Sequence, residues 1–119
     1  MVSPANPSPL PKRLLARLTA SASPDEAEFN ALALELHAFQ RQQNEPYARF
    51  CAGQPEPDHW SRIPAVPTGA FRLAPLRTFP EAETRAVFRT SGTTGEGYGS
   101  HYFRTLALYE ASILGMWAR

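Results

Sequence analysis

One run of the sequence combines glycines with hydroxyl side chains in a pattern that suits anion binding. The run FRTSGTTGEGYGSHY, residues 88–102, holds four glycines and five serines or threonines. Gly92 and Gly95 can adopt positive φ and let a bulky phosphate approach the main chain. The hydroxyls of Ser91 and Thr93 can rotate to donate hydrogen bonds to phosphate oxygens. These residue types predict a phosphate-binding loop, although a plain turn has the same composition.

The segments around the loop must position it. TRAVFRTS, residues 84–91, has the β-branched and aromatic content of a short strand. After the loop, residues 101–119 return to helical spacing. We therefore expect the order strand, loop, helix, in which the unpaired N–H groups and the dipole of the helix start face the anion. His101 then lies at the helix start, where it either binds a phosphate or caps the turn.

Two common phosphate motifs do not fit the run. The GxxxxGK[ST] pattern fails because the chain has a single lysine, Lys12, far from the loop. The GxGxxG pattern fails because Ser100 stands at the third glycine. A Walker-type loop and a dinucleotide fingerprint are both poor fits.

TSGTTG, residues 90–95, resembles the phosphate loop of the adenylate-forming enzymes, whose pattern is [ST]-S-G-[ST]-T-G. IPAVPTGAFR, residues 63–72, and GSHYFRTLALYEASI, residues 99–113, are similar to segments that flank this loop in the LuxE-type acyl-protein synthetases. The resemblance covers the chain from Ile63 onward, whereas residues 1–62 match only as a loosely helical leader.

The resemblance implies an ATP-dependent fatty-acid ligase that forms an acyl-adenylate, releases diphosphate and passes the acyl group to a protein thiol. In bacterial bioluminescence such activation supplies an acyl reductase with the group that becomes the aldehyde. The partners implied are a fatty acid or another carboxylic acid and an acyl reductase, and the cofactors are ATP and Mg²⁺, for which the chain offers no nameable ligand. No catalytic residue is assigned. The implied contacts with the ATP phosphates belong to Ser91, Gly92, Thr93, Thr94, Gly95 and His101.

The chain departs from the acyl-CoA synthetases just after the motif. Those enzymes usually continue with Pro-Lys-Gly, whereas this chain has Glu96 and then GYG at 97–99. The missing lysine favours the LuxE-type branch, and Arg89 or Arg104 could supply the positive charge. Phenylacetate-type or antibiotic-pathway acid ligases, a non-catalytic phosphate-binding module and a plain helical interaction domain remain alternatives.

Composition narrows the class of protein. The chain has 119 residues, a formal net charge of +1 and 43% hydrophobic residues, so it suits one small α/β domain without a nucleic-acid partner. Cys51 is the single cysteine, which excludes an internal disulfide, and we expect it to be an inert, part-buried thiol. The three histidines are scattered, so no metal site is expected. The proline-rich start is neither a signal peptide nor a membrane span, and a cytoplasmic location is the expectation.

Three stretches are expected along the chain: a flexible proline-rich N-terminus over 1–22, a helical and proline-rich leader over 23–84, and the start of an adenylate-forming α/β domain over 85–119. In the first, a helical turn or two is plausible over 14–18. The clearest helix follows Ser23 as N-cap, with Glu26 completing a capping box, and ends near Asn44.

A second short helix should end at Gly53. The proline-rich stretch that follows is too apolar for a linker, and we expect it to lie against a core. The expected anchors are Ile63, Val66, Phe71, Leu73 and Leu76.

The strand near Val87 needs a pairing partner, and a parallel partner would follow the crossover helix. On this interpretation the chain is the N-terminal piece of a longer ligase, inactive by itself. His37 and His59 are expected to be structural or exposed.

Overall fold

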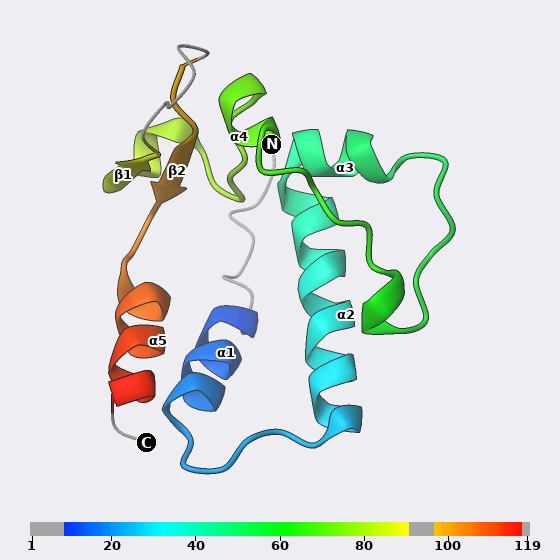
Figure 1. Cartoon of the computed structure of the whole chain (residues 1–119), viewed down its shortest axis with the longest axis vertical. Helices are drawn as coiled ribbons and strands as arrows, with labels where there is room; N and C mark the ends of the chain where they lie inside the picture. Colours follow the sequence, from blue (N-terminus) through cyan, green and yellow to red (C-terminus); the bar gives the residue numbers. More distant parts are fainter. Residues whose placement is uncertain (1–8, 91–96, 118–119) are drawn as a thin grey trace, which may run out of the picture.

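The computed structural model describes residues 9–90 and 97–117, which form a mixed α/β structure (Figure 1). The long helix α2 and the short helix α3 stand on one side, and α1 and α5 lie side by side on the other. A two-stranded sheet and the short helix α4 lie together above them in this view. None of the helices in the described ranges has the length and apolarity to cross a membrane.

Helix α1 spans Leu10–Thr19 and begins next to Pro9. The sequence predicted a flexible tail over 1–22 with a helical turn over 14–18, so the helix is longer than expected. Leu10 is 2% exposed and anchors its first turn in the core. Proline is compatible with the first turn because the amide hydrogen that it lacks has no partner there anyway.

Helix α2 spans Glu26–Gln43 and helix α3 spans Glu45–Cys51. The predicted N-cap Ser23 is wrong, because the side chain of Asp25 caps α2 by accepting from the Glu28 amide at 2.8 Å. Asn44 ends α2 and caps α3, with its Oδ1 3.2 Å from the Tyr47 amide. The second helix was predicted correctly, and Gly53 follows it with φ of 80°.

The proline-rich stretch contains three single-turn elements, the first of which packs on α2. These are the 3-10 turn η1 at Trp60–Arg62, helix α4 at Ala70–Leu73 and the 3-10 turn η2 at Glu81–Glu83. Ile63, Val66, Phe71 and Leu76 do line a cavity against α2 and α3, as predicted for anchors. Leu73 does not, since it is 86% exposed.

Strand β1 at Ala86–Arg89 pairs with strand β2 at Ser100–Phe103, antiparallel, with Val87 opposite Tyr102. The predicted order strand, loop, helix is therefore wrong: the loop joins two strands of a hairpin. Pairing with β2 satisfies one edge of β1, and the parallel partner expected after the helix stays a prediction for the other edge. Phe88, Phe103 and Tyr109 form an aromatic cluster that ties the hairpin to α5, with ring centroids 4.8–5.9 Å apart.

Helix α5 spans Ala107–Trp117 and packs on α1 (Figure 1). The helices approach closely at Gly115, where an added Cβ would lie 3.0 Å from the Leu18 carbonyl oxygen. Ala111 is buried, while Leu114, Met116 and Trp117 are 67–81% exposed. Helix α1 therefore covers only part of the apolar surface of α5.

Candidate phosphate-binding site

The hairpin loop begins and ends at a neck formed by Thr90 and Gly99. The Thr90 amide donates to the Gly99 carbonyl at 2.9 Å, and the Gly99 amide donates to Thr90 Oγ1 at 3.0 Å. These bonds extend the β1–β2 ladder by one pair beyond Arg89 and Ser100. Thr90 is the first residue of the motif, and its hydroxyl therefore helps to join the two ends of the neck.

Gly99 is buried at this neck and leaves no room for a side chain. A Cβ at this position would lie 3.0 Å from Thr90 Oγ1 and 3.4 Å from the Cβ of Phe71. Gly97, at the returning end of the loop, has φ of 94°, which favours glycine. Both glycines therefore have a local structural reason for their presence.

Most of the predicted phosphate contacts lie outside the described residues. These are Ser91, Gly92, Thr93, Thr94 and Gly95. Of the predicted set only His101 is described, and it lies in β2 rather than at a helix start. Its imidazole packs on the ring of Phe71, with 4.2 Å between centroids and 32° between planes.

The expected stabilisation of a phosphate by the dipole of the following helix is wrong, because no helix begins at the end of the loop. Helix α5 begins at Ala107, after β2 has carried the chain away from the loop. The Ala107 amide instead donates to Thr105 Oγ1 at 3.2 Å. A phosphate at the loop would depend on loop donors and nearby side chains rather than on the start of α5.

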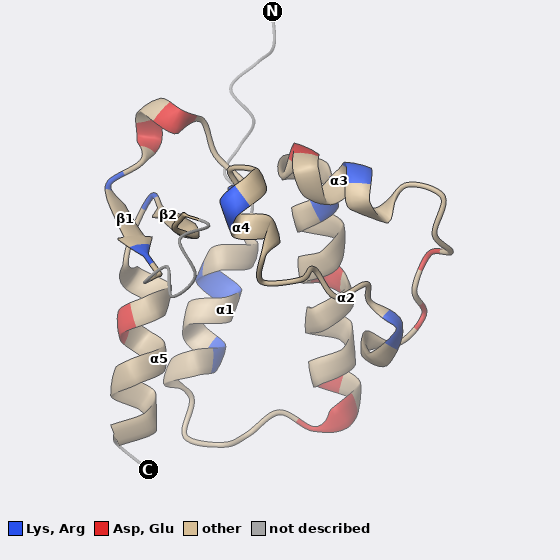
Figure 2. Cartoon of the chain, turned by 45° about the horizontal axis from the view of Figure 1, so that its top comes forward, with Lys and Arg blue, Asp and Glu red and all other residues tan. Residues whose placement is uncertain are grey.

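The structure places two arginines near the neck. Arg89 ends β1, is exposed, and forms no ion pair with the residues that the structure describes. Arg72 of α4 lies closer than the sequence indicated, because its Cγ would be 4.0 Å from a Cβ on Gly99. Figure 2 shows the basic stretches of α4 and β1 around the hairpin.

Arg104, the other cation considered from the sequence, points to different partners. Its guanidinium lies 3.6 Å from Glu83 Oε1 and 5.7 Å from the ring centroid of Phe79. Arg72 was missed because it is far from the loop in sequence and reaches it only when α4 packs on β2. Arg72 ends the run at 63–72, which resembles a segment that flanks the phosphate loop.

Within residues 9–90 and 97–117, no three His, Cys, Asp or Glu side chains lie close enough together to hold a metal ion. Cys51 is a buried free thiol, 2% exposed, as expected for an inert cysteine. His37 is buried and His59 contacts Trp60, Ser61 and, at 3.6 Å, Glu26.

Comparison of the chain with protein-family models, with curated proteins and with solved structures gives no match.

Proposed function

We propose that the β1–β2 loop binds the β- and γ-phosphates of ATP, as part of an acid ligase that forms an acyl-adenylate and transfers the acyl group to a protein thiol. The motif TSGTTG, which resembles the phosphate loop of adenylate-forming enzymes, is the main support. The observation that supports it from the structure is the neck at Thr90 and Gly99, whose two hydrogen bonds join the ends of the segment that carries the motif.

The chemistry needs donors where negative charge develops. When a carboxylate attacks the α-phosphate, charge builds on the leaving diphosphate, and fixed N–H and hydroxyl donors stabilise that charge without reorganising. Arg89, at the end of β1 next to Thr90, carries a guanidinium, a planar set of donors suited to phosphate oxygens. Mg²⁺ would neutralise part of the same charge when bound, but no residue set in the described ranges fits it.

Binding is testable on the chain itself. Titration with ATP and with diphosphate, followed by calorimetry and by the melting temperature, should show saturable binding that raises Tm. Gly92→Val and Thr94→Ala should each weaken it by about tenfold or more, since about 1.4 kcal/mol of lost contact suffices. Leu73→Ala is the matched control, because this residue follows Arg72 on α4 and is 86% exposed.

A well-folded sample with no response to ATP or diphosphate would exclude the proposal. If the protein is an acid ligase, exchange between ATP and diphosphate should appear only when a carboxylic acid is added. Nucleotide binding without acid-dependent exchange, measured on the product of the complete reading frame, would instead favour the non-catalytic phosphate-binding module. Exchange that depends on an aromatic acid rather than a fatty acid would favour the phenylacetate-type ligases.

A further inference from the structure

Strand β1 has an outer edge that pairs with no other strand in the ranges 9–90 and 97–117. It lies on the outer side of the hairpin, with β2 between it and α4 (Figures 1 and 2). Val87 is 42% exposed, and Arg89 is exposed as well. The edge is therefore open to solvent and to another extended segment of chain.

The hydrogen bonds of the hairpin fix which backbone groups point toward this edge. In an antiparallel ladder, residues that bond across the pair alternate with residues whose N–H and C=O groups point away from it. The Thr90 amide bonds to the Gly99 carbonyl at 2.9 Å, so the groups of Thr90 and, two residues earlier, Phe88 face β2. Val87 and Arg89 therefore direct two donors and two acceptors toward the open edge.

Two exposed arginines flank the edge. Arg85 precedes β1 and Arg89 ends it, which places a basic residue at each end of the strand (Figure 2). Neither forms an ion pair with a carboxylate in the part of the chain that the structure describes. At about 3.3 Å per residue, the two positions stand about 13 Å apart along the strand.

The acidic residues just before β1 are engaged with other cations. In the turn η2, Glu81 lies 3.9 Å from the guanidinium of Arg77 and Glu83 lies 3.6 Å from that of Arg104. The edge of β1 therefore keeps a local excess of positive charge, although the formal net charge of the chain is only +1.

These charges decide which extended segment fits the edge. A second copy of the chain paired through β1 would bring four arginines to one pair of strands, and like charges on neighbouring strands are destabilising. Charged side chains are a common means of preventing such pairing between identical edges. A strand with carboxylates four residues apart would instead bring a negative charge near each arginine, because paired strands have nearly the same rise per residue.

We propose that the open edge of β1 binds an extended, acidic segment of a partner protein, which adds a third strand to the hairpin. Val87 and Arg89 supply main-chain hydrogen bonds, and the side chains of Arg85 and Arg89 select carboxylates. The inference goes beyond the proposed function and does not depend on it. The parallel strand expected from the sequence is the competing occupant of the same edge.

The test uses the capped peptide Thr-Glu-Val-Thr-Val-Glu-Thr, whose two glutamates stand four residues apart. Two control peptides carry glutamine or lysine in place of both glutamates. NMR titration of the full chain, without nucleotide because Arg89 is also a candidate for phosphate binding, should show saturable binding of the glutamate peptide at about 1 mM or below. The glutamine peptide should bind about fivefold more weakly, and high salt should remove most of this preference because exposed charges are screened.

Amide hydrogen exchange locates the peptide on the edge. In the free chain the amides of Val87 and Arg89 should exchange faster than that of Phe88, which faces β2. With the glutamate peptide at about ten times Kd, exchange at Val87 and Arg89 should slow by about tenfold, since these amides exchange only from the unbound chain.

One variant and a matched control test the role of charge. Arg85→Glu should weaken binding of the glutamate peptide by about fivefold or more and strengthen binding of the lysine peptide. Arg49→Glu makes the same change at an exposed arginine of α3 and should bind as the wild type does. Arg85 has no assigned part in phosphate binding, so ATP titration of Arg85→Glu separates failure of this inference from failure of the proposed function.

Several results would overturn the inference: no binding of the glutamate peptide to the folded chain at millimolar concentration, equal binding of the glutamine peptide, or unchanged exchange at Val87 and Arg89. Protection of these two amides that grows with protein concentration alone would place a second copy on the edge. Their protection in the product of the complete reading frame, before any peptide is added, would assign the edge to a strand of the chain itself. Either of these results also contradicts an acidic partner.

Discussion

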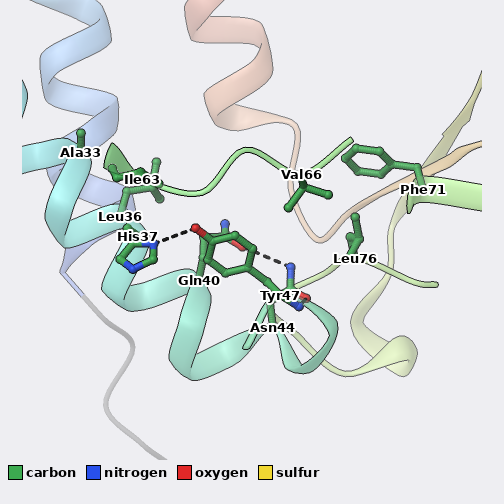
Figure 3. A pocket seen from close by; sticks show the side chains of 10 residues that line it. All are labelled: Ala33, Leu36, His37, Gln40, Asn44, Tyr47, Ile63, Val66, Phe71 and Leu76. Carbon is green, nitrogen blue, oxygen red and sulfur yellow. Dashed lines mark hydrogen bonds between the residues drawn. The ribbon is translucent and has the colours of Figure 1, made fainter. Parts of the chain in front are cut away.

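Phe71 lies against both His101 and the buried Gly99, with its ring on the imidazole and its Cβ beside the glycine, so one side chain of α4 supports the strand β2 and the residue before it. The same ring also lines the cavity beneath α4. Phe71 is therefore packed between the hairpin and the wall of this cavity (Figure 3).

Phe71→Ala should therefore lower both stability and nucleotide affinity. Because Phe71 is only partly buried, we expect a loss of about 1–3 kcal/mol in the free energy of unfolding, less than for a fully buried Phe. Urea unfolding measures the loss, and ATP titration measures the effect on the loop. Leu73→Ala, on the same helix but exposed, should stay within about 0.5 kcal/mol. Equal effects of the two substitutions would contradict this role of Phe71.

Gly99→Ala tests the neck. The added methyl would lie 3.0 Å from Thr90 Oγ1, so Thr90 must move and the two bonds of the neck must weaken. We expect a loss of about 1–2 kcal/mol by urea unfolding together with weaker ATP binding. The control is Gly69→Ala, where the nearest contact is the flexible end of Arg72 at 3.5 Å, and where reduced freedom of the unfolded chain should leave stability unchanged or slightly higher. A neutral Gly99→Ala would show that the neck is not tight in solution.

The start of α2 gives a comparison of two neighbouring candidate caps. Asp25→Ala should cost about 1 kcal/mol because the Glu28 amide loses its acceptor, whereas Ser23→Ala should cost almost nothing. Chemical denaturation of both variants measures the difference. A larger loss of stability in Ser23→Ala than in Asp25→Ala would show that Ser23 is the N-cap of α2, as the sequence favoured.

The raised pKa of Tyr47 predicts that the folded chain loses stability at high pH. Its pKa is raised to about 12 in the folded chain, chiefly by burial, from 10.0 for an ordinary tyrosine. The folded state therefore holds this proton more tightly, so the contribution is complete below about pH 10 and is lost as the pH rises toward 12. At 1.36 kcal/mol per unit, the effect has an upper limit of about 2.7 kcal/mol, and partial exposure reduces it.

Because other groups titrate in the same range, the measurement is the difference between the wild type and Tyr47→Phe. The free energy of unfolding of the wild type should fall more steeply between pH 10 and 12 than that of the variant, which cannot ionise at this position. Parallel pH profiles would mean that the phenol is not held in its neutral form.

Local signals explain which elements the sequence could predict. Helix α2 has apolar residues at helical spacing, and Asn44 acts both as its end and as the start of α3, so both helices followed from neighbouring residues. The choice between Ser23 and Asp25 depended on one hydrogen bond that either side chain could have offered.

The hairpin and the cavity depend on contacts between distant residues. Residues 100–103 continue a helical spacing in sequence, and it is pairing with β1 that makes them a strand. The bond between His37 and Tyr47 joins two helices across Asn44, and Arg72 reaches Gly99 only through the packing of α4 on β2. None of these contacts produces a periodic signal in the sequence, so the residues that surround the loop could not be predicted from it.

The packing of α1 on α5 has a consequence for synthesis of the chain. Helix α1 ends at Thr19, but the surface that covers it, including the close approach of Gly115 to Leu18, is made only after α2 and α3. A ribosome adding about 5–20 residues per second would leave α1 without its partner for several seconds after α2 and α3 have emerged. During that interval the apolar side of α1 would be available to chaperones, and completion of this part of the fold would wait for α5 to leave the ribosomal tunnel.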